Sequence, residues 1–262
     1  MKAIYDKNTW EEIRDGDKDR VAILPIAATE DHGPHLPLDT DTLIVNRLVG
    51  ALADRFPEEV VVMPTIPYGF NAHHFDFPGV IHIEPETLIA FLTDITKSLA
   101  RHGFRRMLIL NSHGSNAPVI DLAARKTVIA TEVICVSASH WTLSAEAINA
   151  IRRSPMGGIA HACELETALY LHHDPDNVQM DRAVAQVIHD PDSRFFNLDL
   201  AGGAKAMLMR WWSAMTPDGT MGDPTVADAE QGAKFFEAAV EATIALVREI
   251  RALPMPKRVD HH

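Results

Sequence analysis

Short apolar segments that alternate with helical patterns constrain the fold of this chain more than any other feature of its sequence. The apolar segments cover residues 21–26, 60–63, 107–110 and 133–136. Strands that are apolar on both faces are typical of parallel sheets whose two faces are covered by helices. The alternation of strand, loop and helix therefore predicts an α/β fold with parallel strands and helices on both sides.

The expected helices are marked by residues that favour helix starts and ends. Asp41 can cap one helix, Pro85 suits the first turn of another, and Gly103 can end that second helix. Helical spacing of apolar residues also predicts a helix over residues 116–130 and a long amphipathic helix over residues 229–250. Because neither a repeat nor a linker-like segment separates these elements, we expect one domain.

The charge balance and the apolar pattern limit the classes of partner. Acidic residues outnumber basic ones by 36 to 24, which gives a net charge of −12 and argues against nucleic-acid binding through phosphates. No apolar run reaches the roughly 18 residues that a membrane span needs, and the charged N-terminus does not resemble a signal peptide. We expect a cytoplasmic protein that binds neither nucleic acid nor membranes.

The chain holds 14 histidines, and the first group to consider follows the first predicted strand. Glu30 and His32 are two residues apart, so in an extended segment their side chains point to the same side. With Asp41 they offer oxygen and nitrogen donors that suit Zn²⁺, Mn²⁺ or Fe²⁺ better than Ca²⁺. Alternatively, Asp41 caps its helix and His32 forms a loop hydrogen bond.

His113 lies in a turn rich in Gly, Ser and Asn, directly after the third predicted strand. The carboxyl ends of parallel strands are where ligands bind in open α/β sheets. This position favours a metal ligand or a catalytic base, although a turn histidine bonded to the backbone fits equally well.

A third group combines His161 with Glu164 and Glu166. If a helix begins here, His161 and Glu164 share a face, and Glu166 points roughly the other way. Carboxylates that enter an apolar run need a partner or a metal ion. The alternative is a surface helix whose glutamates lie near the positive end of its dipole.

These groups belong to sequence blocks that resemble the creatininase (creatinine amidohydrolase) family. The blocks are LPIAATEDHGPHLPLDTDT (residues 24–42), FPGVIHI (77–83), NSHGSN (111–116), HACELET (161–167) and GTMGDPTVADAEQG (219–232). The resemblance implies a single-domain three-layer α/β/α sandwich with a mostly parallel central sheet, spanning residues 1–258. It also implies two divalent metal ions (Zn, Mn or Fe) and assembly into a homohexamer.

The resemblance assigns the metal ligands by position. The matching residues are Glu30, His32, Asp41 and His113, with Asp41 as the expected bridge between the ions. Creatininase places a glutamate two residues after the histidine matched by His113, where this chain has Ser115. Many relatives carry a glutamate at the position of Glu164 instead, so we expect Glu164 rather than Glu166 to be the last ligand.

The same resemblance implies the activity. We expect a metal-dependent amidohydrolase in which a metal-activated water cleaves a non-peptide C–N bond of a small cyclic amide, lactam or formamide. His161 matches the family's proton shuttle, and we assign His161 and Glu164 to catalysis. The alternatives are a deformylase or a peptidase-like member of the family, a hydrolase that uses a histidine with a serine, and a non-catalytic ligand-binding relative.

The substrate pocket departs from creatininase. The approach to His161 reads SPMGGIAH and lacks the tryptophan of creatininase, which argues against creatinine itself as the substrate. Trp141 is expected either in the pocket or in the core. Other candidates for the pocket lie in the loops around residues 68–76 and 194–212, and they are His73, His74, Phe75 and Trp211.

Overall fold

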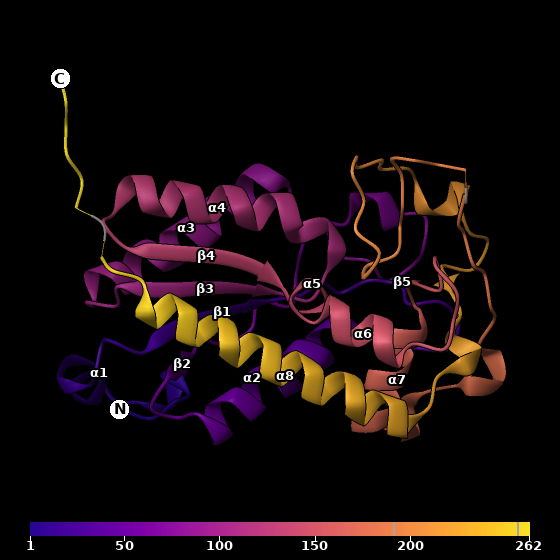
Figure 1. Ribbon diagram of the computed structural model, residues 1–262, viewed down its shortest axis with the longest axis horizontal. Coiled ribbons are helices and arrows are strands. Elements are labelled where there is room, and N and C mark those ends of the chain that lie inside the picture. Colours follow the sequence, from indigo (N-terminus) through magenta and orange to yellow (C-terminus); the bar gives the residue numbers. More distant parts are fainter. Residues whose placement is uncertain (191, 256) are drawn as a thin grey trace.

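A parallel sheet forms the centre of the molecule in the computed structural model, which describes residues 1–190, 192–255 and 257–262 (Figure 1). Its strands pair in the order β2-β1-β3-β4, and every pairing is parallel. The strands are β1 (Val21–Ile26), β2 (Val60–Val62), β3 (Arg106–Asn111) and β4 (Ile134–Ser139). The predicted α/β fold with a mostly parallel sheet is therefore confirmed.

Helices cover both faces of the sheet (Figure 1). The helices α3 (Pro85–Arg101) and α4 (Ala117–Ala130) cover one face, and α2 (Thr40–Arg55) and α8 (Ala229–Ala252) cover the other. Successive side chains of a strand point to opposite faces. Accordingly, Leu108 of β3 packs on the side of α2 and α8, while Ile109 packs on the side of α3 and α4.

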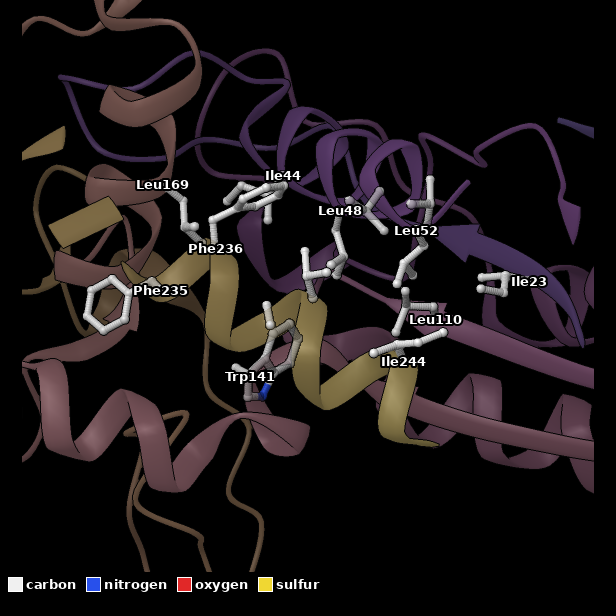
Figure 2. Close-up of a cluster of buried hydrophobic side chains, with 14 of the residues drawn as sticks. Ile23, Ile44, Leu48, Leu52, Leu110, Trp141, Leu169, Phe235, Phe236 and Ile244 are labelled. Atoms are coloured by element: carbon white, nitrogen blue, oxygen red, sulfur yellow. The ribbon is translucent and has the colours of Figure 1, made fainter. Parts of the chain in front are cut away.

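The larger of the two layers of apolar side chains lies between the sheet, α2 and α8 (Figure 2). Phe236 and Ile244 are eight residues apart on α8, so they extend from the same face of this helix. They belong to the same buried cluster as Leu48 of α2. Trp141 is buried in this cluster beside α8, which places it in the core rather than in a substrate pocket.

Smaller elements extend beyond the carboxyl ends of the strands, toward which the arrowheads of β3 and β4 point in Figure 1. They are α5 (His140–Leu143), α6 (Ala145–Ile151), α7 (Glu164–His173) and an antiparallel pair of β5 (Ile159–His161) and β6 (Met221–Gly222). A short α1 (Trp10–Asp15) precedes the sheet. The 3-10 helices are Tyr5–Lys7, Ala72–His74, Gly114–Asn116, Pro175–Asn177, Met180–Arg182, Trp212–Ala214 and Pro224–Val226.

The helix after β1 begins two residues earlier than predicted, and this changes the role of Asp41. The helix starts at Thr40 with Asp39 as its N-cap residue, so Asp41 lies inside the first turn. There the carboxylate is buried and benefits from the positive end of the helix dipole.

Among the residues that the structure describes, no helix is both long and apolar enough to cross a bilayer.

A buried ion pair fastens the long segment between α7 and β6 to the rest of the molecule. The two guanidinium nitrogens of Arg152 donate to the two carboxylate oxygens of Asp199 at 3.1 and 2.7 Å. The side chains of Arg152 and Asp199 are 8% and 0% exposed, and Asp199 also accepts from the backbone N–H of Gly157. The pair therefore holds the segment around Asp199 against the segment that leads into β5.

Removing this carboxylate should be costly. We expect Asp199→Ala to lower the free energy of unfolding by about 3–5 kcal/mol, because the Arg152 charge would stay buried without a partner. Urea denaturation followed by circular dichroism measures the change. The matched control is Glu237→Ala. Glu237 forms an exposed ion pair with Arg55 through two hydrogen bonds, as Asp199 does with Arg152 in the interior. Loss of the exposed pair should lower the free energy of unfolding by less than about 1 kcal/mol. Equal losses for the two variants would contradict the assigned role.

Candidate metal centre

Buried carboxylates and imidazoles converge beyond the carboxyl ends of β1 and β3. Four of the residues predicted to bind metal come together here, and each of them is at most 4% exposed: Glu30, His32, Asp41 and His113. The loop after β1 supplies two of them, the first turn of α2 supplies the third, and the turn after β3 supplies the fourth. His161, at the end of β5, joins the same cluster.

One group of donors consists of Glu30, Asp41 and His113. The Nδ1 atom of His113 lies 2.9 Å from Glu30 Oε1 and 3.4 Å from Asp41 Oδ2. Its Nε2 atom is 3.1 Å from the carbonyl oxygen of Phe70, to which an Nε2–H can donate. That bond holds the Nε2–H and directs Nδ1 toward the two carboxylates, which is the orientation of a metal-binding histidine.

A second group lies on the other side of Asp41. The Nε2 atom of His32 is 3.4 Å from Asp41 Oδ1 and 3.8 Å from Glu166 Oε1. Glu166 also groups with His32 and His161 as a possible ligand set. The two oxygens of Asp41 therefore face two different histidines, as expected of a carboxylate that bridges two ions.

Glu164 lies outside these groups, contrary to its expected place as the last ligand. Its Oε1 accepts from the backbone N–H of Arg153 and from the side chain of Gln231, and its Oε2 accepts from the backbone N–H and the hydroxyl of Ser154. The argument from a shared helical face does not apply, because His161 ends β5 and α7 begins at Glu164. Between them Ala162 turns the chain with a φ of 49°.

Glu166 takes the position that the sequence led us to expect for Glu164. Its Oε2 accepts from the backbone N–H of Cys163 as part of a capping box, and its Oε1 is directed toward His32. The capping-box spacing, in which the third residue of a helix reaches back to the N-cap, is the sequence signal that could have oriented this side chain.

A third group contains a residue that the sequence analysis considered only for the pocket. His74 joins Glu30 and His161 as a possible ligand set, with its Nε2 atom 3.6 Å from Glu30 Oε2. Its Nδ1 atom bonds to Asp31 Oδ1 at 2.7 Å. The indole ring of Trp212 covers this group at 4.5 Å from the ring of His74 and 5.5 Å from that of His161.

The other pocket candidates have different positions. His73 is buried and bonded to the hydroxyl of Ser115 at 3.0 Å, while Phe75 and Trp211 are more than half exposed. The aromatic side chain over the site is thus Trp212 and not its neighbour Trp211. Trp211 and Trp212 are adjacent and belong to no periodic apolar pattern, so the sequence did not indicate which of them points inward.

Burial and charge act against each other throughout the site. Burial disfavours the charged form of His113, but the carboxylates of Glu30 and Asp41 outweigh it and raise its pKa to about 10. Burial likewise favours the neutral form of Glu166, but the imidazole of His32, 3.8 Å away, and that of His161 lower its pKa to about 2. The glutamate is therefore ionised at neutral pH and available to a cation.

Buried atoms without hydrogen-bond partners mark the space between these groups. In the described part of the chain, Glu30 Oε2, His32 Nε2 and Asp41 Oδ2 are buried and accept or donate no hydrogen bond. Such atoms are costly unless another group compensates them. Oxygen and imidazole donors around two neighbouring positions fit a pair of divalent cations.

Comparisons with known proteins give matches over most of the chain. The sequence model of the creatininase family, described as creatinine amidohydrolase, matches residues 6–247. The chain is 30% identical to a mycofactocin precursor peptide peptidase of Mycobacterium ulcerans over 232 residues, which are 86% of this chain and 83% of the relative. It is also 30% identical to a creatinine amidohydrolase of Pseudomonas putida over 259 residues, which are 92% and 94% of the two chains.

Solved structures show the same likeness. A mutant creatininase complexed with creatine superimposes with a TM-score of 0.79 at 27% identity, covering 97% of this chain and all of the other. A structure described as creatininase Mn gives a TM-score of 0.78 with the same identity and coverage.

Because Glu164 and Glu166 have different surroundings, we expect their replacement by Gln to have different effects on stability. In metal-free buffer, Glu164→Gln should lower the free energy of unfolding by about 2–3 kcal/mol, because an amide group would face the N–H donors that bind the carboxylate. Glu166→Gln should cost less, since only the backbone N–H and the thiol of Cys163 donate to it among the residues described and His32 lies 3.8 Å away. Urea denaturation of both variants measures the difference, and the reverse order would contradict the structural role of Glu164.

Proposed function

This chain belongs to the creatininase family of hydrolases, and from that premise we propose that it is a metal-dependent amidohydrolase. The proposed reaction is hydrolysis of a non-peptide C–N bond in a cyclic amide, a lactam or a formamide. The observation that carries the proposal is the position of Asp41, whose two oxygens face two separate groups of metal donors.

The donors divide between two ions in a simple way. Glu30, Asp41 and His113 would hold one ion, and His32, Asp41 and Glu166 would hold the other. The mixture of carboxylate and imidazole suits Zn²⁺, Mn²⁺ or Fe²⁺, and solved creatininases are described with manganese and with zinc. Two such ions supply Lewis acidity and lower the pKa of a water molecule toward neutrality.

His161 is the residue that we assign to proton transfer. Its Nε2–H donates to the carbonyl oxygen of Asp31 at 2.7 Å, which leaves Nδ1 as the free nitrogen on the side of Glu30. In this orientation His161 can hold a proton and deliver it to the leaving nitrogen. Glu164 has no part in the scheme, because its oxygens bind backbone and side-chain donors elsewhere.

A peptide substrate is the second candidate, and two observations favour it. The chain is as similar to the mycofactocin precursor peptide peptidases as to creatinine amidohydrolase. In addition, the segment that carries Trp212 exposes large apolar side chains that could contact a peptide. They are Phe195, Phe196, Met207, Leu208 and Trp211.

Loss of a ligand should remove metal and activity together. For His113→Ala we expect the metal content to fall from two ions per chain to one or none, because Glu30 and Asp41 lose the nitrogen donor that they share. Loss of a residue that only hydrogen-bonds to a metal ligand lowers activity by roughly 10–100-fold. Loss of the ligand itself should lower activity by more than that. Elemental analysis and steady-state rates measure both effects. The exposed His102 provides the control, since His102→Ala should change neither, and normal metal with full activity in His113→Ala would refute the assignment.

A substrate panel distinguishes the proposed activities. The enzyme loaded with metal should hydrolyse at least one lactam, cyclic amide or formamide, and chelation with EDTA should abolish the reaction because the water is no longer activated. Product release is followed by chromatography, with short apolar peptides in the same panel. Turnover of the peptides alone would favour the second candidate. Two bound ions without any turnover would favour a non-catalytic ligand-binding relative.

A further inference from the structure

We infer that Glu30, His74 and His161 form a third metal site, weaker than the other two, whose occupation inhibits the enzyme. This inference rests on the proposed function, because it assumes that two ions already occupy the donors around Asp41. The third ion would be a zinc-type divalent cation with three protein ligands. Its ligands are the distal oxygen of Glu30, the Nε2 atom of His74 and the Nδ1 atom of His161.

The three donors lie close enough together for a tetrahedral ion to draw them to one point. The Nε2 atom of His74 is 3.6 Å from Glu30 Oε2, and the Nδ1 atom of His161 is 3.7 Å from Glu30 Oε1. Bonds of about 2.0–2.1 Å at tetrahedral angles separate neighbouring ligand atoms by about 3.3 Å. One donor atom from each of the three residues lies within 4.8 Å of the other two, so inward shifts of up to about 1.5 Å would complete the site.

Both imidazoles are already oriented as metal ligands by the same residue. The Nδ1 atom of His74 bonds to the carboxylate of Asp31 at 2.7 Å, and the Nε2 atom of His161 bonds to the carbonyl oxygen of Asp31 at 2.7 Å. Each bond leaves the opposite ring nitrogen directed toward Glu30. A carboxylate behind a histidine fixes its tautomer and strengthens it as a ligand, as in many zinc sites.

Glu30 has one oxygen for each of two neighbouring ions. Its Oε1 lies 2.9 Å from His113, in the group assigned to the first ion. Its Oε2 is buried and, among the residues described, has no hydrogen-bond partner, although it faces His74. A cation bound between this oxygen and the imidazole of His74 would compensate the buried carboxylate oxygen, which otherwise stays without a partner.

Charge determines the order in which the sites fill. Four carboxylates surround the cluster, from Glu30, Asp31, Asp41 and Glu166, and two divalent cations balance their four negative charges. A third divalent cation adds an excess of two positive charges, so it binds more weakly. It also occupies the Nδ1 lone pair of His161, and an imidazole bound to a metal through this atom cannot transfer a proton there.

Metal titration of the full chain tests the inference. Protein in which the terminal His261 and His262 are replaced by Ala is dialysed against increasing free Zn²⁺, and the bound zinc is counted by elemental analysis. We expect two ions at low zinc and three at higher zinc, with the rate of hydrolysis falling as the third binds. His74→Ala should stop at two ions and lose the inhibition by excess zinc.

Two further variants separate a third site from a general effect of mutation. Asp31→Asn should bind the third ion about 10–100-fold more weakly, because the carboxylate behind His74 is removed. His73→Ala, which removes the adjacent buried histidine, should still bind three ions. A wild-type chain that stops at two ions, or a His74→Ala variant that binds three, would overturn the inference. Fewer than two ions in the wild-type chain would refute the proposed function instead.

Discussion

The carboxylate of Asp41 is the group around which the site is arranged. It lies in the first turn of α2, with one oxygen 3.4 Å from His32 and the other 3.4 Å from His113. These histidines follow β1 and β3, which are neighbours in the sheet. Parallel pairing brings the two loops to one edge, and the packing of α2 on the same strands places Asp41 between them. The position of the site thus depends on the same contacts as the core.

Burial gives this cluster its chemical character. Carboxylates removed from water must be neutralised or compensated, and two glutamates only two residues apart achieve this differently. Glu164 is compensated by backbone and side-chain donors from Arg153, Ser154 and Gln231, and it fastens α7 to its surroundings. Glu166 is directed toward His32 and retains an oxygen for a cation. One glutamate therefore contributes to stability, and the other is available for chemistry.

Much of the framework could be predicted from local pattern. The apolar strands, the start of α3 at Pro85 and the long helix α8 follow directly from periodicity and helix signals, and the structure confirms them. The family resemblance named Glu30, His32, Asp41 and His113, which the structure brings together. The orientations of Glu164 and Glu166 depend on where β5 ends and α7 begins, and the capping-box spacing from Cys163 to Glu166 was the local signal for them. The positive φ of Ala162 sets that boundary.

The sequence by itself determined the order of strands and helices and the positions of the residues that follow β1 and β3, because these depend on periodicity and on neighbours in the chain. Only the tertiary structure decided which groups meet across long separations. Asp31 contacts both His74 and His161, and Trp212 covers the same two imidazoles. Such contacts arise from the packing of segments up to 138 residues apart in the chain, the separation of His74 and Trp212. No local propensity encodes them, since each depends on how several buried elements fill a common space.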